Sequence, residues 1–311
     1  MAGTILLIVF VIVFVILLAT AVGLWLFGER GRLPRPSTLK ALRAGGLHDL
    51  FTLKSLHGYI YSRWTNQYLN VLFNRIIPHL GERGKKWWRD RYHAKILTQE
   101  LAEAIILLDH NIARRDLEQI IPYPMARDLV LKGPPDVAVY ECGCRHTRAN
   151  PCQPTQVCMV IGQPFVDFTL EHNPKNSRRL TQVEAVELLR AEHERGHLHS
   201  AWFRDICLNR FYVLCNCCKC CCGGIQAMVK YGGRMMASSG YVSQVDETLC
   251  TSCGVCVEAC PFGALSINGG AIVSWKKCMG CGVCTGQCPT KAIVLIRDER
   301  KGVPMDVRLL P

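Results

Sequence analysis

The sequence predicts an α+β protein with an N-terminal transmembrane helix, a mostly helical cysteine-rich middle domain and a small C-terminal β/α domain. Three observations support this prediction. Residues 4–27 are uncharged and mostly apolar. Residues 36–130 show helical periodicity that glycines and prolines interrupt. Eight of the 19 cysteines lie near the C-terminus in two copies of one motif.

The chain of 311 residues has room for two domains and an anchor. We expect five segments: a transmembrane anchor (1–28), a basic juxtamembrane helical region (29–96), a cysteine-rich helical domain with an extra metal or cluster site (97–239), a domain with two clusters (240–300) and an irregular tail (301–311).

The first segment has the length of a membrane span. As a helix, residues 4–27 would be about 36 Å long, and a hydrocarbon core is about 30 Å thick. A signal peptide is the alternative, but it needs a basic start and a shorter apolar core. Positive charge follows the span instead, at Arg30, Arg32, Arg35, Lys40 and Arg43. The positive-inside rule then predicts a single-pass protein of the cell membrane, with its N-terminus outside and its cluster domains on the cytoplasmic side.

The net charge of +12 is concentrated in one region. Residues 30–95 contain 14 lysines or arginines and only three acids. A nucleic-acid protein can show such an excess. Directly after a span it favours contact with anionic lipid headgroups, so we expect no nucleic-acid partner. The aromatic residues here, which include Tyr59, Trp64 and Trp87, suit either the membrane interface or the core of a helical subdomain.

Two secondary-structure elements are well marked in the middle of the chain. A helix is expected over Thr98–Asn111, with Thr98 as its cap and apolar residues at helical spacing. A short strand is expected over Val137–Tyr140, directly before a group of cysteines.

Ten of the middle cysteines form two groups that suggest metal binding. The first group comprises Cys142, Cys144, Cys152 and Cys158, which can supply one complete site for a cluster or a zinc ion. The second comprises Cys215, Cys217, Cys218, Cys220, Cys221 and Cys222. Six cysteines in eight residues cannot all bind one cubic iron–sulfur cluster (a cube). The loop therefore surrounds an unusual cluster, serves two centres or keeps some free thiols. We expect further iron–sulfur clusters here in preference to zinc. Cys207 stands alone and suits a small buried apolar residue.

A histidine motif imitates a protease site. His193 and His197 match the H-E-x-x-H pattern, which requires both histidines on one face of a helix. The helix here begins with a capping box at Thr181 and should end near Gly196. His197 and His199 then lie beyond it, and we expect them to be solvated loop residues, with a place beside a cluster as the alternative.

The C-terminal motif is C-x2-C-x2-C-x3-C-P, and its two copies are 28 residues apart. This is the bacterial-type two-cluster ferredoxin pattern, in which the fourth cysteine binds the other cluster. One 4Fe-4S cluster should therefore bind Cys250, Cys253, Cys256 and Cys288. The second should bind Cys278, Cys281, Cys284 and Cys260. Zinc and disulfides are the alternatives, but this spacing with proline, twice, is not a zinc pattern.

The residues around these motifs predict a small β/α unit. Residues 264–273 suggest a hairpin with an Asn-Gly turn, and residues 291–296 a further strand. Cluster binding requires reduced thiols, so we expect a reducing and anaerobic compartment.

Residues 97–300 resemble a family of 4Fe-4S dicluster ferredoxin-domain proteins from anaerobic bacteria and archaea. The resemblance rests on residues 122–128, on Glu141-Cys-Gly-Cys-Arg145 with Cys152 and Cys158, on residues 191–199, and on the CNCCKCCCG segment at 215–223. It departs from the family at Gly143, where members commonly have proline. The resemblance implies cluster binding and electron transfer in a membrane-anchored member, and it implies no substrate.

Three functions remain open. The first is an electron carrier that relays single electrons between its clusters and a redox protein or membrane oxidoreductase complex. The second is a reductase subunit, because Cys221-Cys222-Gly223 is similar to the CCG motifs of heterodisulfide reductases, which hold noncubane clusters. The third is a redox sensor or assembly factor. We favour the first, an electron-transfer protein or a subunit of an oxidoreductase complex over a stand-alone enzyme.

Overall fold

A seven-stranded sheet forms the centre of the molecule. The computed structural model describes residues 2–29, 34–46 and 52–310. The strand order is β6-β4-β5-β8-β7-β1-β9, antiparallel except for the β1–β9 pair. The strands are β1 (Tyr92–Leu97), β4 (Val137–Glu141), β5 (Gln156–Ile161), β6 (Ser177–Leu180), β7 (Leu198–Arg204), β8 (Arg210–Cys217) and β9 (Met236–Ala237).

Helices cover both faces of this sheet. On one face lie α6 (Gln99–Ile106) and α9 (Gln182–Glu194), which enclose a core that includes Leu101, Leu189 and Phe203. On the other lie α3 (Leu53–Arg63), α4 (Thr65–Val71), α7 (Gly143–His146), α8 (Phe165–His172) and α10 (Gly223–Tyr231). This second core contains several of the middle cysteines, so their side chains, predicted to bind metal, face this layer.

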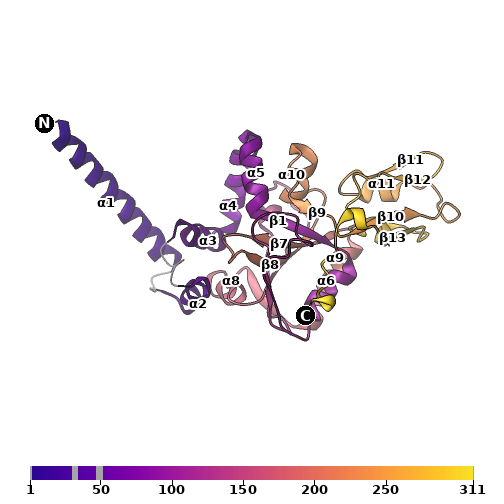
Figure 1. The fold of residues 1–311 in the computed structure, drawn as a ribbon, viewed down its shortest axis with the longest axis horizontal. Coiled ribbons are helices and arrows are strands. Elements are labelled where there is room, and N and C mark those ends of the chain that lie inside the picture. Colours follow the sequence, from indigo (N-terminus) through magenta and orange to yellow (C-terminus); the bar gives the residue numbers. More distant parts are fainter. Residues whose placement is uncertain (1, 30–33, 47–51, 311) are drawn as a thin grey trace.

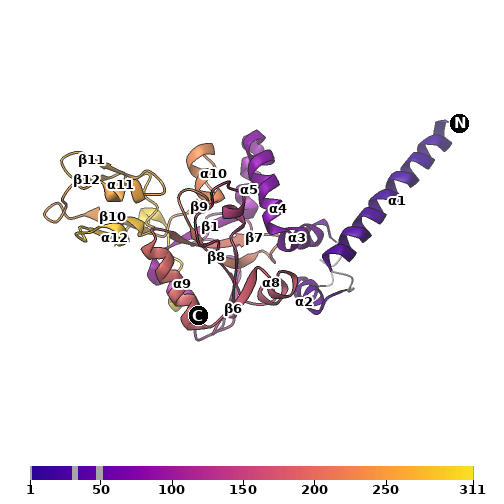
Figure 2. The same cartoon turned by 180° about the vertical axis from the view of Figure 1, so that it is seen from behind.

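The N-terminal helix α1 (Ala2–Gly28) projects away from the body, on the side opposite the C-terminal domain (Figures 1 and 2). Its residues Ile5–Gly28 are long and apolar enough to cross a membrane. A signal sequence near an N-terminus meets the same criteria. Arg30 and Arg32 of the predicted basic flank lie outside the described residues. Before strand β1 the chain also forms α2 (Pro36–Gly45), which precedes α3 and α4. After these come a π-helical turn η1 (Leu72–Ile76), a 3-10 turn η2 (Ile77–His79) and α5 (Glu82–Arg91).

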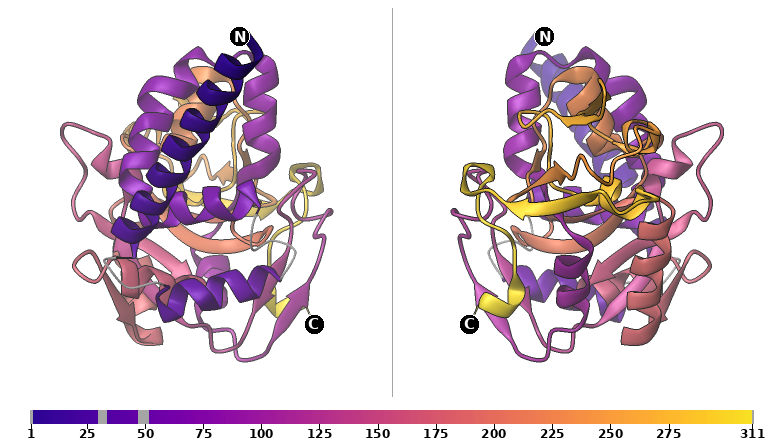
Figure 3. Two further views of the ribbon diagram at one scale, coloured as in Figure 1. Left: turned by 90° about the vertical axis from the view of Figure 1, so that its left-hand side faces the viewer. Right: turned by 90° about the vertical axis from the view of Figure 1, so that its right-hand side faces the viewer.

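The C-terminal domain is the small β/α unit that its motifs predicted. It contains β10 (Tyr241–Val245), α11 (Val255–Ala259), the hairpin β11 (Leu265–Ile267) and β12 (Ala271–Val273), α12 (Val283–Gln287), β13 (Ile293–Arg297) and η3 (Glu299–Lys301). The end-on views of Figure 3 show α1 nearest the viewer on one side and this domain nearest on the other.

Hydrogen bonds join this domain to the rest of the protein. Gln287 donates from Nε2 to the carbonyl of Glu194 at 2.9 Å, and Lys219 donates from Nζ to the carbonyl of Glu258 at 2.7 Å. Ser239 donates from Oγ to the carbonyl of Gly280 at 2.7 Å. The cysteine-rich segment around Lys219 therefore lies directly against α11.

The expected mostly helical middle domain is wrong. Its helices are real, including α6 capped by Thr98 and α9 with the capping box of Thr181, but they cover a sheet. Strand β7 shows why the prediction failed: all seven of its residues are buried, so it lacks the polar–apolar alternation of a half-exposed strand. Helix α6 also ends at Ile106, five residues before the predicted end. A small pair, β2 (Ile112–Arg114) and β3 (Leu129–Leu131), follows it.

The C-terminal segment also differs from an irregular tail. Met305 and Val307 are fully buried in the core that α6 and α9 enclose. A 3-10 turn, η4 (Val307–Leu309), carries Arg308, whose Nη1 lies 2.7 Å from a carboxylate oxygen of Glu100 on α6. The segment thus completes the core on that face of the sheet.

Candidate metal centres

Two small cavities in the C-terminal domain are each lined by four cysteines. One, of about 20 Å³, is lined by Cys250, Cys253, Cys256 and Cys288. The other, of about 10 Å³, is lined by Cys260, Cys278, Cys281 and Cys284. In each set the fourth cysteine ends the helix within the other motif: Cys288 is the C-cap of α12 and Cys260 that of α11. These sets fit two cubes, each with three thiolates from one motif and one from the other.

Backbone donors repeat around both sets. The amide of Ala264 donates to Cys260 Sγ at 3.2 Å, and that of Ala292 donates to Cys288 Sγ at 3.3 Å. Gly254 and Gly282 precede the two helices with φ of 81° and 79°, a backbone that glycine adopts without strain. The two motifs therefore form the same local structure.

The two cavities differ in exposure. Cys260, Cys278, Cys281 and Cys284 are all buried, whereas Cys253 is exposed and Cys250 and Cys288 are intermediate. Ser243 of β10 adds donors to the buried set only: its Oγ lies 3.1 Å from Cys284 Sγ and its amide donates to Cys278 Sγ. Burial and hydrogen bonds to sulfur both set cluster potentials, so the two centres are inequivalent.

The ten middle cysteines divide into two sets, and the division does not follow the order of the sequence. Six of their thiols form a closed ring of neighbours, which we call the six-thiol ring. In order around the ring these are Cys142, Cys158, Cys215, Cys217, Cys222 and Cys144, which returns to Cys142. The Sγ atoms of Cys158 and Cys215 are 3.8 Å apart.

Strand register creates this ring. Met159 pairs with Leu214 across β5 and β8, which places Cys158 opposite Cys215. Cys215 and Cys217 share a face of β8 because side chains two apart point the same way. Cys142 and Cys222 are the N-caps of α7 and α10. A side chain at Gly143 or Gly223 would collide with Leu69 or Phe73, so glycine at both positions lets α4 and η1 close over the ring.

The other four thiols form a compact group near the surface, which we call the quartet. Cys152, Cys218, Cys220 and Cys221 place their Sγ atoms within 4.8 Å of one another. Arg148 holds this turn by donating from Nε and Nη2 to the carbonyl of Cys221. The predicted groups of four and six are thus rearranged: Cys152 joins three members of the later group, and three others join the ring. Cys207 belongs to neither set and is buried, as predicted.

Arg145 lies between the two sets. Its side chain is fully buried, and its Nη2 is 3.0 Å from Glu192 Oε2. Its Nη2 also donates to the carbonyl of Asn216 at 3.4 Å, between two ring cysteines of β8, and its Nη1 donates to the carbonyl of Pro154, two residues after Cys152 of the quartet. A buried guanidinium in this position balances the negative charge that clustered thiolates carry.

The histidines beside these sets are not solvated, so that expectation is wrong. His197 Nδ1 lies 2.7 Å from Glu192 Oε2, and His199 Nδ1 lies 2.7 Å from Asn216 Oδ1. Asn216 stands between two ring cysteines on β8, and His199 is fully buried on the neighbouring β7. Burial lowers the pKa of His199 to about 4, so its ring is neutral at neutral pH. His199 lies in buried strand β7, and His197 directly precedes it beside Glu192, so pairing that the sequence does not reveal explains the error.

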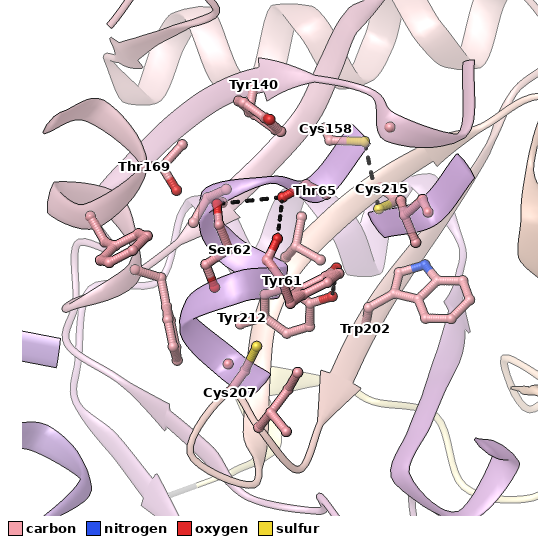
Figure 4. A pocket seen from close by; sticks show the side chains of 18 of the residues that line it. Tyr61, Ser62, Thr65, Tyr140, Cys158, Thr169, Trp202, Cys207, Tyr212 and Cys215 are labelled. Atoms are coloured by element: carbon pink, nitrogen blue, oxygen red, sulfur yellow. Dashed lines mark hydrogen bonds between the residues drawn. The ribbon is translucent and has the colours of Figure 1, made fainter. Parts of the chain in front are cut away.

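A cavity of about 180 Å³ adjoins the six-thiol ring. All six ring cysteines line it, and its other walls come from α2, α3, α8 and strands of the sheet. Figure 4 shows Cys158 and Cys215 near Tyr61, Tyr212 and Trp202 in this space. The hydroxyls of Tyr61 and Tyr212 are 2.7 Å apart. Sequence reasoning missed this wall, because the residues that form it are about 150 positions apart.

Comparison with known families agrees with the C-terminal sites. A family described as a 4Fe-4S binding domain matches residues 243–266 and 271–294, one match for each motif. No curated protein matches the chain. The chain therefore carries a ferredoxin-like dicluster domain, and it is an iron–sulfur protein whose cubes serve electron transfer.

Proposed function

We propose that the chain is a membrane-anchored electron-transfer protein that relays single electrons to or from a redox partner at the cytoplasmic membrane face. The pair of four-cysteine cavities carries this proposal. They lie beside one another around α11 and α12, which each contribute ligands to both. Two adjacent cubes form a relay for single electrons, and the protein supplies burial and hydrogen bonds that tune them.

Double variants test the proposed ligand sets. Anaerobically purified protein should carry about eight irons in this domain. C253A/C288A removes two ligands of one proposed cube, so it should keep about four of these irons. C281A/C288A removes a ligand from each cube and should lose all of them. Iron analysis with electron paramagnetic resonance checks both, and C207S is the control outside every set. Equal iron loss in the two double variants would contradict the exchange of fourth cysteines.

The membrane part of the proposal is supported by α1 and its contacts. Arg63 donates from Nε to the carbonyl of Gly28 at 2.9 Å, and the rings of Trp25 and Tyr59 stack at 5.1 Å. The end of the span is therefore attached to α3. A basic juxtamembrane region supports an orientation with the clusters in the cytoplasm and contact with lipid headgroups.

A reductase is the second candidate, and the cavity at the six-thiol ring favours it. A site like that of heterodisulfide reductases has a structural obstacle, because the vicinal Cys221 and Cys222 belong to different sets. Reoxidation of the reduced protein by the small disulfide cystamine would support disulfide reductase activity. If cystamine causes no reoxidation although the clusters can be reduced, the electron carrier is left.

A further inference from the structure

The spacing of the quartet indicates which kind of metal it holds. In a tetrahedral site with metal–sulfur bonds of about 2.3 Å, thiolate sulfurs lie about 3.8 Å apart. The thiolates of a cube bind four different irons and therefore lie further apart. Among the described residues, the quartet is the one group whose ligand atoms all lie within 4.8 Å of one another. The ferredoxin cysteines, which fit cubes, do not form such a group.

The six-thiol ring has the opposite character. Each thiol has two other ring thiols as neighbours. In the described part of the chain, no three ring thiols all lie within 4.8 Å of one another, as those of the quartet do. It also offers two thiolates more than one tetrahedral ion or one cube binds. Every ring thiol is buried or half-buried, and α10 adds the positive end of its dipole at Cys222. These features suit a centre with several irons and a high negative charge.

We propose that the quartet binds a single tetrahedral zinc-type ion and that the six-thiol ring binds a separate polynuclear iron–sulfur centre. The quartet then ties the loop at Cys152 to the turn at Cys218–Cys221, and the ring provides the redox centre. For the quartet, the proposal differs from the expectation of iron–sulfur clusters in preference to zinc.

Elemental analysis of the full-length, anaerobically purified protein tests this assignment. C152S should lose about one zinc per chain and keep its iron, and C215S should keep zinc and lose iron beyond the eight of the ferredoxin domain. C207S should change neither count. A loss of about four irons without zinc in C152S would overturn the quartet assignment, and unchanged iron in C215S would overturn the ring assignment.

X-ray absorption at the zinc edge of the unaltered protein gives a result that does not depend on whether a variant folds. The assignment requires four sulfur neighbours at about 2.3 Å. Zinc that is absent, or bound through nitrogen or oxygen, would overturn it.

The cavity beside the ring carries a second, independent inference. At about 180 Å³ it is far larger than the spaces of about 10 and 20 Å³ in the two cube sites. An apolar cavity of roughly 150 Å³ is enough to bind benzene. All six ring cysteines line this space, so the ring centre takes part of it. A cube site accounts for only about 10–20 Å³, and the remaining space suits an aromatic ring. Its aromatic lining comprises Tyr59, Tyr61, Phe73, Tyr92, Tyr140, Phe165, Phe168, Trp202 and Tyr212.

The opposite end of this cavity meets a buried polar network at the foot of α1. Glu29 is fully buried and accepts hydrogen bonds from Tyr59 Oη at 2.9 Å and Thr38 Oγ1 at 2.8 Å. Thr38 Oγ1 also lies 2.9 Å from His172 Nε2. Tyr59 and Thr38 line the cavity, and Tyr59 stacks on Trp25 of α1. The cavity therefore connects a thiol-rich end to a titratable end beside the membrane helix.

We infer that this cavity binds the head group of a lipophilic quinone, an inference that rests on the proposed electron-transfer function. The ferredoxin cysteines and the six-thiol ring would hold clusters that, once reduced by a low-potential donor, would supply two electrons one at a time. Two protons would enter from water through the Glu29 network. The two carbonyl oxygens of the quinone become hydroxyls, which gives the quinol and oxidised clusters. The single span need not form the pocket, because α2, α3, α8 and the sheet form it.

Stopped-flow reoxidation of the dithionite-reduced full chain in detergent tests the inference. The probe is 2,3-dimethoxy-5-methyl-1,4-benzoquinone, and ferricyanide is the acceptor that needs no pocket. The rate should saturate with quinone concentration. It should fall at least tenfold in Ser62→Trp, which fills the cavity, and stay unchanged in Leu53→Trp, an exposed position on the same helix. Ferricyanide should react equally with all three proteins.

The outcomes separate this inference from the proposed function. Reoxidation by ferricyanide together with a quinone rate that stays linear in concentration in the unaltered protein would overturn the quinone site and leave the electron carrier intact. Clusters that neither dithionite nor the stronger reductant titanium(III) citrate can reduce would overturn both. Equal quinone rates in Ser62→Trp and the unaltered protein would show that quinone reacts elsewhere.

Discussion

Arg145 is the residue on which the electrostatics of the middle centres depend. It lies between the quartet and the ring, and its fully buried partner is Glu192. R145Q removes a positive charge beside thiolates, so reduction of the ring centre becomes less favourable. We expect its potential to fall by roughly 50–100 mV, measured by redox titration with electron paramagnetic resonance.

The stability of this variant separates the two roles of Arg145. R145Q removes one partner of buried Glu192, which keeps Arg195 Nη1 at 2.8 Å and His197 Nδ1 at 2.7 Å. The loss of stability should therefore stay below the roughly 3–5 kcal/mol of a buried charge left without any partner. R145Q/E192Q removes both charges, so it should recover part of that stability and part of the lowered potential, because loss of the carboxylate opposes loss of the guanidinium. A double variant whose potential is as low as that of R145Q would show that Glu192 does not act on the ring centre.

His93 predicts a pH dependence of stability. It is fully buried between Tyr123 and Phe203, and neither ring nitrogen has a hydrogen-bond partner within the described part of the chain. Burial lowers the pKa of His93 from 6.5 to about 3. Below pH 6.5 the His93 side chain therefore binds a proton in the unfolded chain but stays neutral in the folded protein. Stability should fall as pH decreases from 6.5, by up to about 1.4 kcal/mol per pH unit.

H93F tests this account. It removes the unpaired nitrogens and keeps a ring of similar size, so it should raise the melting temperature at pH 7 and reduce its dependence on pH between 7 and 5. H79F at an exposed position is the control, and it should change neither quantity much. An unchanged pH slope in H93F would assign the acid sensitivity to other groups.

At the scale of elements, the two copies of one motif should give two different potentials. Strand β10 supplies Ser243 to the buried set, and the turn after α12 supplies Thr290, whose Oγ1 lies 3.6 Å from Cys288 Sγ. Donors to sulfur stabilise the reduced cluster. S243A should lower the potential of the cube at the buried set by tens of millivolts and leave that of the other cube unchanged. T290V should lower the potential of the other cube, to a smaller extent because its contact is longer. Identical effects on both cubes would contradict the assigned surroundings.

At the scale of the whole molecule, α1 should hold the protein in the membrane. Full-length protein should sediment with membranes and resist extraction by salt, and deletion of residues 2–27 should release a protein with unchanged iron content. Mass spectrometry of the purified protein decides between a span and a signal sequence. A mature chain that begins after residue 27 would overturn the anchor.

Contacts between distant strands explain why the structure of the middle of the chain was hard to predict. Cubes need four thiolates from two short motifs, and the spacing of each motif places three of them, so the ferredoxin domain could be predicted from Cys250–Cys288. The ring instead needs Cys158 opposite Cys215, which are 57 residues apart and meet only through the pairing of β5 with β8. Fully buried β7 concealed that sheet.

The sequence by itself determined the local chemistry: an apolar helix of spanning length, and thiolates that a repeated spacing brings to two cubes. Tertiary structure alone decided how ten other cysteines divide into a compact quartet and a wide ring, and that a cavity joins the ring to the foot of α1. The physical reason is that a thiol three residues away along the chain has few places to lie, whereas one some sixty residues away is placed by strand register and by the helices packed above it.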